Sequence, residues 1–256
     1  MRDRVMDGIA DMGGTPGWGP VHPPGRDEPV FEEPWQGRAF ALAILSSRLA
    51  CGGINTDAFR HAQERLDRAA YLDDGYYGRW LNAGELMLTD SAFLAPGAVD
   101  ARARNLRGEH VEEPPIPVPA RPHRTPTAEG ALRSVDDSPV FAVGERVRAK
   151  DMSPPGHTRL PGYVRGHAGT VELIQPAAVL PDTNAHFLGE NPQHVYSVRF
   201  DSCELWGADA EPFALTAELY ESYLETPARP PPQHRARGFP QPCAPRRSSN
   251  CSPSAG

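Results

Sequence analysis

Hydrophobic residues in the first half of the chain recur at helical spacing. In WQGRAFALAILSSRLA, at 35–50, Phe40, Ile44 and Leu49 fall on one stripe with little glycine or proline between them. This pattern predicts a first helix. The residues GGIN then stop it, and Asn55 or Thr56 can cap the next helix by accepting its free amide protons.

Two further helices are predicted downstream of this cap. TDAFRHAQERLDRAAYL, at 56–72, predicts a second helix, whose buried face carries residues spaced by three and four: Phe59, Ala62, Leu66 and Ala70. YYGRWLNAGELML, at 76–88, predicts a third helix with a stripe headed by aromatic rings: Tyr76, Trp80, Gly84 and Leu88. The first half is therefore expected to be a helical domain.

The periodicity stops at 111–127, where six residues are proline, and this composition predicts an extended linker. Beyond about 139 the pattern changes to strands. FAVGERVRAK and AGTVELIQ are short strand candidates, and HVYSVRF alternates two sets of side chains: Tyr196, Val198 and Phe200 against Val195, Ser197 and Arg199. Short strands separated by turn signals predict a small antiparallel barrel.

The predicted fold class is α+β, with helices before strands. Glycine and proline at the start of the chain exclude a regular helix there, yet Trp18 and Phe31 are bulky, so we expect this arm to lie along a partner or along its own body, with a frayed end as the alternative. The predicted segments are an extended arm at 1–35, a helical domain at 36–105, a proline-rich linker at 106–138, a β-barrel at 139–226 and a disordered proline- and arginine-rich tail at 227–256.

Composition and charge limit the classes of partner. The chain has 29 prolines, 24 glycines and 39% hydrophobic residues, so part of it is expected to stay unpacked. No apolar run is long enough to span a bilayer or to serve as a signal peptide, which predicts a soluble cytoplasmic protein with no membrane contact. The net charge is −7, and five arginines without an acid follow Glu225, which leaves −12 for the body and argues against nucleic-acid binding.

A search for a self-sufficient active site fails. The four cysteines are scattered without a CxxC pair, and no GxSxG, HExxH, P-loop or GxGxxG motif occurs. Asp73 and Asp74 read as a turn or helix cap, and His157 and His167 have no metal-ligand spacing. Two arginines stand in unusual company: Arg60 on the second helix, and Arg159 after Pro-Pro-Gly-His-Thr. Taken alone, both fit surface arginines whose stems cover apolar groups.

Several blocks resemble the β subunit of nitrile hydratase. They are MDGIADMGGTPGWGPV and RDEPVFEEPWQGRAFAL at the front, SPPGHTRLPGYVRGHAGTV in the middle and LGENPQHVYSVRFDSCELWG near the end. They stand in the family's order and span Met6 to about Glu225. The resemblance implies that the barrel is SH3-like, after an N-terminal arm and a helical domain. The chain departs from the family at its end, LYESYLET, and in the added tail, and MRDRV before Met6 is expected to reflect a misassigned start.

The resemblance also implies an activity and a partner. Enzymes of this family hydrate a nitrile to an amide at a low-spin Fe(III) or Co(III) centre, which cysteines of the α subunit hold in the motif C-x-x-C-S-C. That motif is absent from this sequence. We therefore expect no metal in this chain and an αβ heterodimer or α2β2 assembly with a nitrile hydratase α subunit, acting on a small nitrile.

The family's functional residues have matches here. Two metal-bound cysteines of the α subunit are oxidised to sulfinate and sulfenate, and arginine suits such anions because its planar fork stays protonated. The matching arginines are Arg60 and Arg159. Tyr76, Trp80 and Phe59 match or adjoin the family's pocket residues, although a plain core role fits these aromatics as well. Arg79 replaces the family's usual histidine before Trp80.

Two other readings remain open. In the first, the chain is a metallochaperone or activator that resembles the β subunit. Such helper proteins resemble only one half of the β subunit, whereas both halves and both arginines are present here. It can also be a relative of thiocyanate hydrolase, whose chain is split at the linker that is intact here. These features favour the nitrile hydratase reading.

Overall fold

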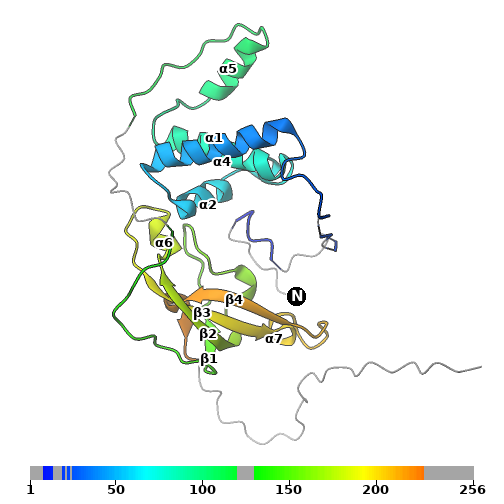
Figure 1. Cartoon of the computed structure of the whole chain (residues 1–256), viewed down its shortest axis with the longest axis vertical. Coiled ribbons are helices and arrows are strands. Elements are labelled where there is room, and N and C mark those ends of the chain that lie inside the picture. Colours follow the sequence, from blue (N-terminus) through cyan, green and yellow to red (C-terminus); the bar gives the residue numbers. More distant parts are fainter. Residues whose placement is uncertain (1–7, 14–18, 21, 24, 120–129, 228–256) are drawn as a thin grey trace, which may run out of the picture. The chain divides into compact units, whose positions relative to one another are not determined.

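The computed structural model describes residues 8–13, 19–20, 22–23, 25–119 and 130–227 (Figure 1). Trp18 of the predicted arm, the centre of the linker at 120–129 and the tail at 228–256 lie outside these residues. The chain forms two compact units, each assembled from separate stretches of sequence. Unit 1 comprises Met1–Val135, Met152–Tyr163 and Ala177–Gln193, and unit 2 comprises Asp136–Asp151, Val164–Pro176 and His194–Gly256.

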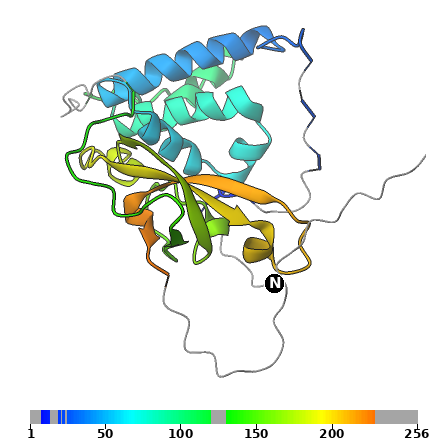
Figure 2. The same ribbon diagram turned by 60° about the horizontal axis from the view of Figure 1, so that its bottom comes forward.

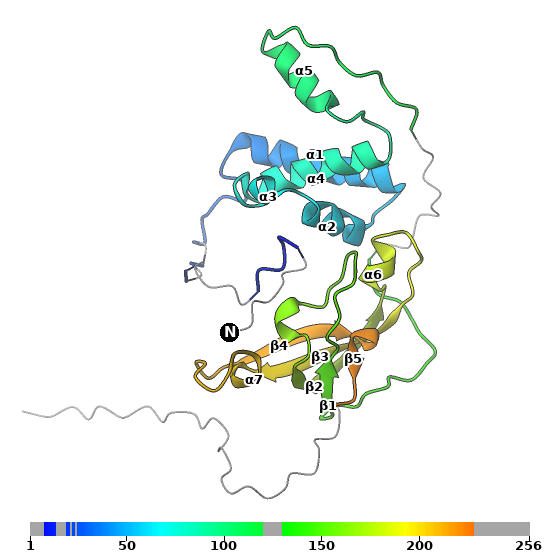
Figure 3. The same ribbon diagram turned by 180° about the vertical axis from the view of Figure 1, so that it is seen from behind.

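Unit 1 is helical. Its helices are α1 (Pro34–Cys51), α2 (Thr56–Glu64), α3 (Arg68–Leu72), α4 (Gly75–Asp90), α5 (Ala98–Leu106) and α6 (Pro181–Asn184). Two views show α1 and α4 running side by side (Figures 1 and 3). No single described helix has both the length and the apolar character needed to cross a membrane; only α1 and α2 taken together, with a bend of 108° between them, reach that length and composition.

The predicted first and third helices are confirmed, and the predicted second helix is wrong as a single element. Helix α2 ends at Glu64, and α3 starts after Asp67, whose side chain accepts the backbone N–H of Ala70 at 3.0 Å. An aspartate in this position starts a new helix because it satisfies one of the first free amides. Leu66 therefore lies between two helices and is only half-buried.

Small residues, rather than the predicted stripe, form the packed face of α1. Phe40, Ile44 and Leu49 are 39%, 40% and 51% exposed, whereas Ala43 is fully buried. Gly84 of α4 lies against this face, where a Cβ atom would be in tight contact with Cβ of Ser46 at 3.3 Å and in ordinary contact with the Cα of Ala43 at 3.5 Å. The buried cluster of unit 1 comprises Ala43, Ala50, Cys51, Ala58, Phe59, Ala62, Ala83 and Met87.

The described part of the arm contacts its own unit. The carboxylate of Asp11 accepts the backbone N–H of Gly162 at 3.1 Å. The ring of Phe31 lies 5.1 Å from that of Tyr77 and 6.1 Å from that of Phe40. At these residues the arm lies along its own body, which is one of the two arrangements expected from the sequence.

Unit 2 contains an antiparallel sheet whose strands follow the order β4-β3-β2-β1-β5. The strands are β1 (Arg146–Ala149), β2 (Ala168–Ala178), β3 (Gln193–Asp201), β4 (Ala214–Tyr220) and β5 (Leu224–Glu225). Figure 2 shows the long strands of this sheet from a second side. The short helices are η1 (Gly162–Val164), α7 (Ser202–Trp206) and η2 (Glu221–Tyr223). The α+β class is confirmed, but β4 and β5 are open edges, so closure into an SH3-like barrel is not confirmed.

The sheet of unit 2 packs more tightly than simple alternation predicts. Val195 and Ser197 are buried along with Tyr196, so β3 is covered on both faces over this stretch. Gly169 of β2 permits the close packing, because a Cβ atom there would lie 2.6 Å from Cγ1 of Val198 and 2.8 Å from the carbonyl oxygen of Arg199. A larger residue would push β2 away from β3.

Candidate functional site

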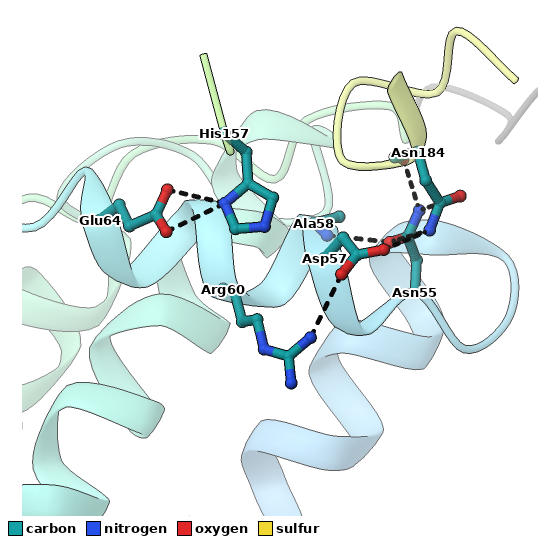
Figure 4. A network of polar contacts seen from close by, with 7 residues as sticks. All are labelled: Asn55, Asp57, Ala58, Arg60, Glu64, His157 and Asn184. Carbon is teal, nitrogen blue, oxygen red and sulfur yellow. Dashed lines mark hydrogen bonds and ion pairs between the residues drawn. The ribbon is translucent and has the colours of Figure 1, made fainter. Parts of the chain in front are cut away.

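The start of α2 is fixed by a network of polar side chains (Figure 4). The Asn55 side chain accepts the backbone N–H of Ala58 at 2.9 Å, so Asn55 is the cap that the sequence left open between two residues. Its amide also donates to the carbonyl oxygen of Asn184 at 2.9 Å, and the Asn184 amide donates to Asp57 at 2.9 Å. These contacts join residues 129 and 127 positions apart and hold the first turn of α2 in one orientation.

Arg60 lies on the next turn of α2 and is held by Asp57. Its Nη1 is 3.2 Å from Oδ1 of Asp57, whose other carboxylate oxygen accepts the amide of Asn184 (Figure 4). The Asp57 side chain is 12% exposed and that of Arg60 is 45% exposed. One edge of the guanidinium is therefore anchored, and the exposed remainder is available to an anion outside the described chain.

His157 is the most deeply buried charged or titratable side chain described in unit 1, with 1% of its surface exposed. Its Nδ1 lies 2.9 Å from both carboxylate oxygens of Glu64, one turn beyond Arg60 on α2 (Figure 4). Its backbone N–H donates to Nε2 of His186 at 3.1 Å. These contacts fix both the ring and the backbone of His157.

The pKa shifts of Glu64 and His186 follow from the contacts of this cluster. Burial alone would raise the pKa of Glu64, but the hydrogen bond from His157 and the nearby His61 outweigh burial and hold that pKa at about 2. His61 Nδ1 lies 3.6 Å from the Glu64 carboxylate. Burial, followed by the charges of His61 and His157, lowers the pKa of His186. A neutral His186 is the form that can accept the N–H of His157.

Arg159 follows this anchored histidine by two residues. Leu160 is 1% exposed, so a buried residue lies on each side of the exposed Arg159 segment. Gly156 makes the anchoring possible, because a Cβ atom there would lie 2.1 Å from Nε2 of His186. The prolines, glycine and histidine of SPPGHTR thus fix the backbone from which Arg159 projects.

His61, Glu64 and His157 also have the donor chemistry of a cation site, with one ligand atom from each lying within 4.8 Å of the others. The 2.9 Å separations of His157 and Glu64 are those of charge-assisted hydrogen bonds, so a shared proton accounts for them. His167 belongs to a different contact, 3.8 Å from Glu204. Of the described cysteines, Cys51 is buried in the helical core and Cys203 lies on α7.

The three predicted pocket aromatics lie in one cluster. The rings of Phe59 and Trp80 are 5.1 Å apart, and those of Tyr76 and Trp80 are 5.4 Å apart. Phe59 is 7% exposed and belongs to the helical core, whereas Tyr76 is 55% exposed. The cluster therefore extends from a buried ring at Phe59 to an exposed ring at Tyr76.

Arg79 stands beside this cluster on α4. Its guanidinium carbon is 4.9 Å from the centre of the Tyr71 ring and 5.2 Å from that of Tyr76. The neighbouring acids serve the helix ends, as the sequence suggested: Asp73 ends α3 and Asp74 precedes α4. The Asp74 carboxylate accepts the amide of Asn82 at 2.7 Å.

Glu64, His186 and Asn184 are parts of the site that sequence reasoning missed. Glu64 had a weak signal, because it lies four residues after Arg60 and therefore on the same side of a helix. His186 and Asn184 had none, since they lie 122 and 120 residues beyond the end of α2 in sequence. Contacts of that separation depend on the fold and leave no local pattern.

Both halves of the chain match known protein families. The family described as “Nitrile hydratase beta subunit, N-terminal” matches residues 6–131, and “Nitrile hydratase beta subunit, C-terminal” matches residues 130–226. The chain is 38% identical over 222 residues to a nitrile hydratase subunit beta of Pseudomonas putida, covering 86% of this chain and 99% of the relative. It is 35% identical over 232 residues to a cobalt-containing nitrile hydratase subunit beta of Pseudonocardia thermophila, covering 86% and 96%.

A thiocyanate hydrolase protein is also similar to part of the chain. The subunit alpha of Thiobacillus thioparus thiocyanate hydrolase is 32% identical over 117 residues, covering 43% of this chain and 93% of that subunit. The similarity therefore leaves more than half of this chain unmatched, whereas the two relatives above extend over most of it.

Proposed function

Because the chain belongs to the nitrile hydratase β-subunit family, we propose that it acts with a nitrile hydratase α subunit to hydrate a small nitrile to the corresponding amide. The Fe(III) or Co(III) ion belongs to that partner, since the chain has no C-x-x-C-S-C motif. When bound there, the ion supplies Lewis-acid polarisation of the nitrile. The contribution of this chain is to hold and orient charged oxygens at the subunit boundary and to wall the pocket.

One observation carries this proposal: α2 organises both candidate arginines. Asp57 orients Arg60 directly, and Glu64 on the same helix holds His157, two residues before Arg159. A single helix of nine residues thus anchors the guanidinium of Arg60 and the backbone segment that carries Arg159, 99 positions further along the sequence. Their role is electrostatic preorganisation, in which donors are aligned before charge develops and take part in no covalent step.

The carboxylate partner of Arg60 leaves this arginine able to bind a further anion. Arg60 is bonded to Asp57 through one terminal nitrogen, and its side chain is 45% exposed. An arginine fork can bind two oxygens at once, which suits the sulfinate and sulfenate groups that the family's α subunit presents. Glu64 and His157 act as positioning residues, since they work through Arg159. Phe59, Trp80 and Tyr76 form the apolar wall.

The two competing functions receive less support. A metallochaperone or activator would need only part of the β subunit, whereas both family regions are matched here. A thiocyanate hydrolase subunit matches 43% of the chain. Neither of these two functions explains why α2 anchors both Arg60 and the segment that carries Arg159.

The proposal is tested by lysine substitutions in the complex with the cognate α chain. Arg60→Lys and Arg159→Lys keep the charge but remove the planar fork, and each is expected to lower kcat for nitrile hydration roughly 10²-fold to 10³-fold. Arg68→Lys is the matched control, because Arg68 is exposed on α3 and has no described ion pair. Unchanged turnover in Arg159→Lys would show that the interface role assigned to this arginine is wrong.

A further inference from the structure

Arg79 is a cation that lies beside two aromatic rings. Its guanidinium lies 4.9 Å from the Tyr71 ring centre and 5.2 Å from that of Tyr76, within the range of cation–π attraction. The side chain is half-buried, and its Nε is buried without a hydrogen-bond partner. Ring faces attract the charge but accept no strong hydrogen bond from an N–H group, so the donors of Arg79 are only partly satisfied.

Two acids at the ends of α4 have other partners. Asp74, which precedes α4, accepts a hydrogen bond from the side-chain amide of Asn82, and Asp90, the last residue of α4, pairs with Arg65. Glu85 lies near the acid Asp100, whose charge adds to burial in raising the Glu85 pKa. Among the described residues, Arg79 therefore has no carboxylate partner, although unsatisfied donors at a half-buried cation are costly.

Tyr76, one of the two rings beside Arg79, also belongs to the aromatic cluster of Phe59, Tyr76 and Trp80. Tyr76 is 5.2 Å from the Arg79 guanidinium and 5.4 Å from the Trp80 ring, and it is 55% exposed. Its ring is thus shared between an apolar surface and a cation. A small molecule that lies on this ring can place an apolar chain toward Trp80 and an anionic group toward Arg79.

We propose that Arg79 binds the carboxylate of the substrate, so that the enzyme prefers small nitriles that carry a carboxylate group at the end opposite the cyano group. This inference rests on the proposed function, since the aromatic cluster is taken as the pocket wall. Arginine suits the task because its N–H groups can meet both carboxylate oxygens, and the tyrosine rings limit the rotamers of its side chain.

The test compares two substrates of equal size in the complex with the α subunit. They are 3-cyanopropanoate and its neutral analogue 3-cyanopropanamide, assayed at pH 7, where the former is ionised. The measured quantity is the ratio of kcat/KM for the carboxylate over that for the amide. We expect a ratio above one, a fall of about ten-fold in Arg79→Gln, and a smaller fall in Arg79→Lys, which keeps the charge but loses the fork.

Arg68→Gln is the control, because it removes the same charge from an exposed position on α3 that has no described ring contact. It is expected to leave the ratio unchanged. An equal ratio in wild type and Arg79→Gln would overturn the proposal, as would weaker assembly with the α subunit in Arg79→Gln without a change in ratio, since Arg79 would then serve a partner carboxylate.

A calorimetric titration of the complex with 3-cyanopropanoate separates this inference from the proposed function. If neither substrate is hydrated by the wild-type complex, the proposed function fails. Binding that is lost in Arg79→Gln but kept in Arg68→Gln would then still support the carboxylate site. Equal binding by all three proteins, or none, would contradict it.

Discussion

Glu64→Gln removes the charge that holds His157 while keeping the size of the side chain. The pKa of Glu64 is about 2, against an ordinary value of 4.5. Since one pKa unit corresponds to about 1.4 kcal/mol, the ionised carboxylate contributes up to about 3 kcal/mol to folding at neutral pH. The side chain is 27% exposed, and glutamine keeps one hydrogen bond to His157, so we expect a loss of about 2 kcal/mol.

The pH dependence gives this prediction a sign. A carboxyl whose pKa is lowered by folding stabilises the protein fully above its unfolded value, and the contribution disappears as the pH falls from about 4.5 to about 2. Wild type should therefore lose stability over this window more steeply than Glu64→Gln. Urea unfolding of the full chain at pH 7, 4.5 and 3, followed by tryptophan fluorescence, measures the difference, because Trp80 packs against Phe59 in unit 1.

Glu85→Gln is the matched control. Burial and the charge of Asp100 raise the pKa of Glu85, so its ionised form is disfavoured by folding and its replacement should maintain or increase stability at pH 7. If Glu64→Gln and Glu85→Gln shifted the urea midpoint in the same direction, the electrostatic account of the Glu64–His157 contact would be refuted. The account would also be refuted if wild type and Glu64→Gln lost stability in parallel between pH 4.5 and 3.

Three further outcomes follow from the same contacts. Gly156→Ala should displace His186 and lower kcat of the complex about ten-fold, as judged by nitrile turnover, whereas Gly25→Ala should have no effect because no described atom lies within 4 Å of its Cβ position. Asn55→Ala should lower the free energy of unfolding by about 1 to 2 kcal/mol, measured by urea titration, because α2 loses its cap and its bond to Asn184; an unchanged midpoint would contradict this. After dialysis against a chelator, the chain should rebind no added transition metal, as measured by elemental analysis. Stoichiometric rebinding that is lost in His61→Ala would contradict this expectation and would show a cation site at His61, Glu64 and His157.

Local features of the fold could be predicted from the sequence where a residue acts on its neighbours. Asn55 caps α2 because its side chain reaches an amide three residues away, and the helical spacing of Tyr76 and Trp80 brings their rings together on α4. The change from helices to strands was equally local, because it depends on a change of period from about 3.6 to 2.

Predictions failed where packing between elements decides the outcome. Helical spacing placed Phe40, Ile44 and Leu49 on one stripe of α1 but could not say which face is covered. The covered face is the one at Ala43, which lies against Gly84 of α4. The close approach of β2 to Val198 and Arg199 of β3 likewise depends on Gly169, a residue of the other strand.

The candidate site shows the same division. Arg60 and Arg159 could be singled out from the sequence, together with the aromatic residues of α4, because their motifs are contiguous. The groups that hold the arginines could not, since Glu64 meets His157 across 93 residues and Asn184 meets Asp57 across 127. Nothing in a local pattern encodes such distances.

The central claim is that this chain forms part of a nitrile-hydrating enzyme only when it is combined with an α subunit. It is tested by purifying the chain alone, the α subunit alone and the co-expressed complex, and by following amide formation from propionitrile by chromatography. We expect a stable complex that forms propionamide, and no product from either chain alone. A complex that assembles with its metal but forms no amide, or turnover by this chain by itself, would contradict the account.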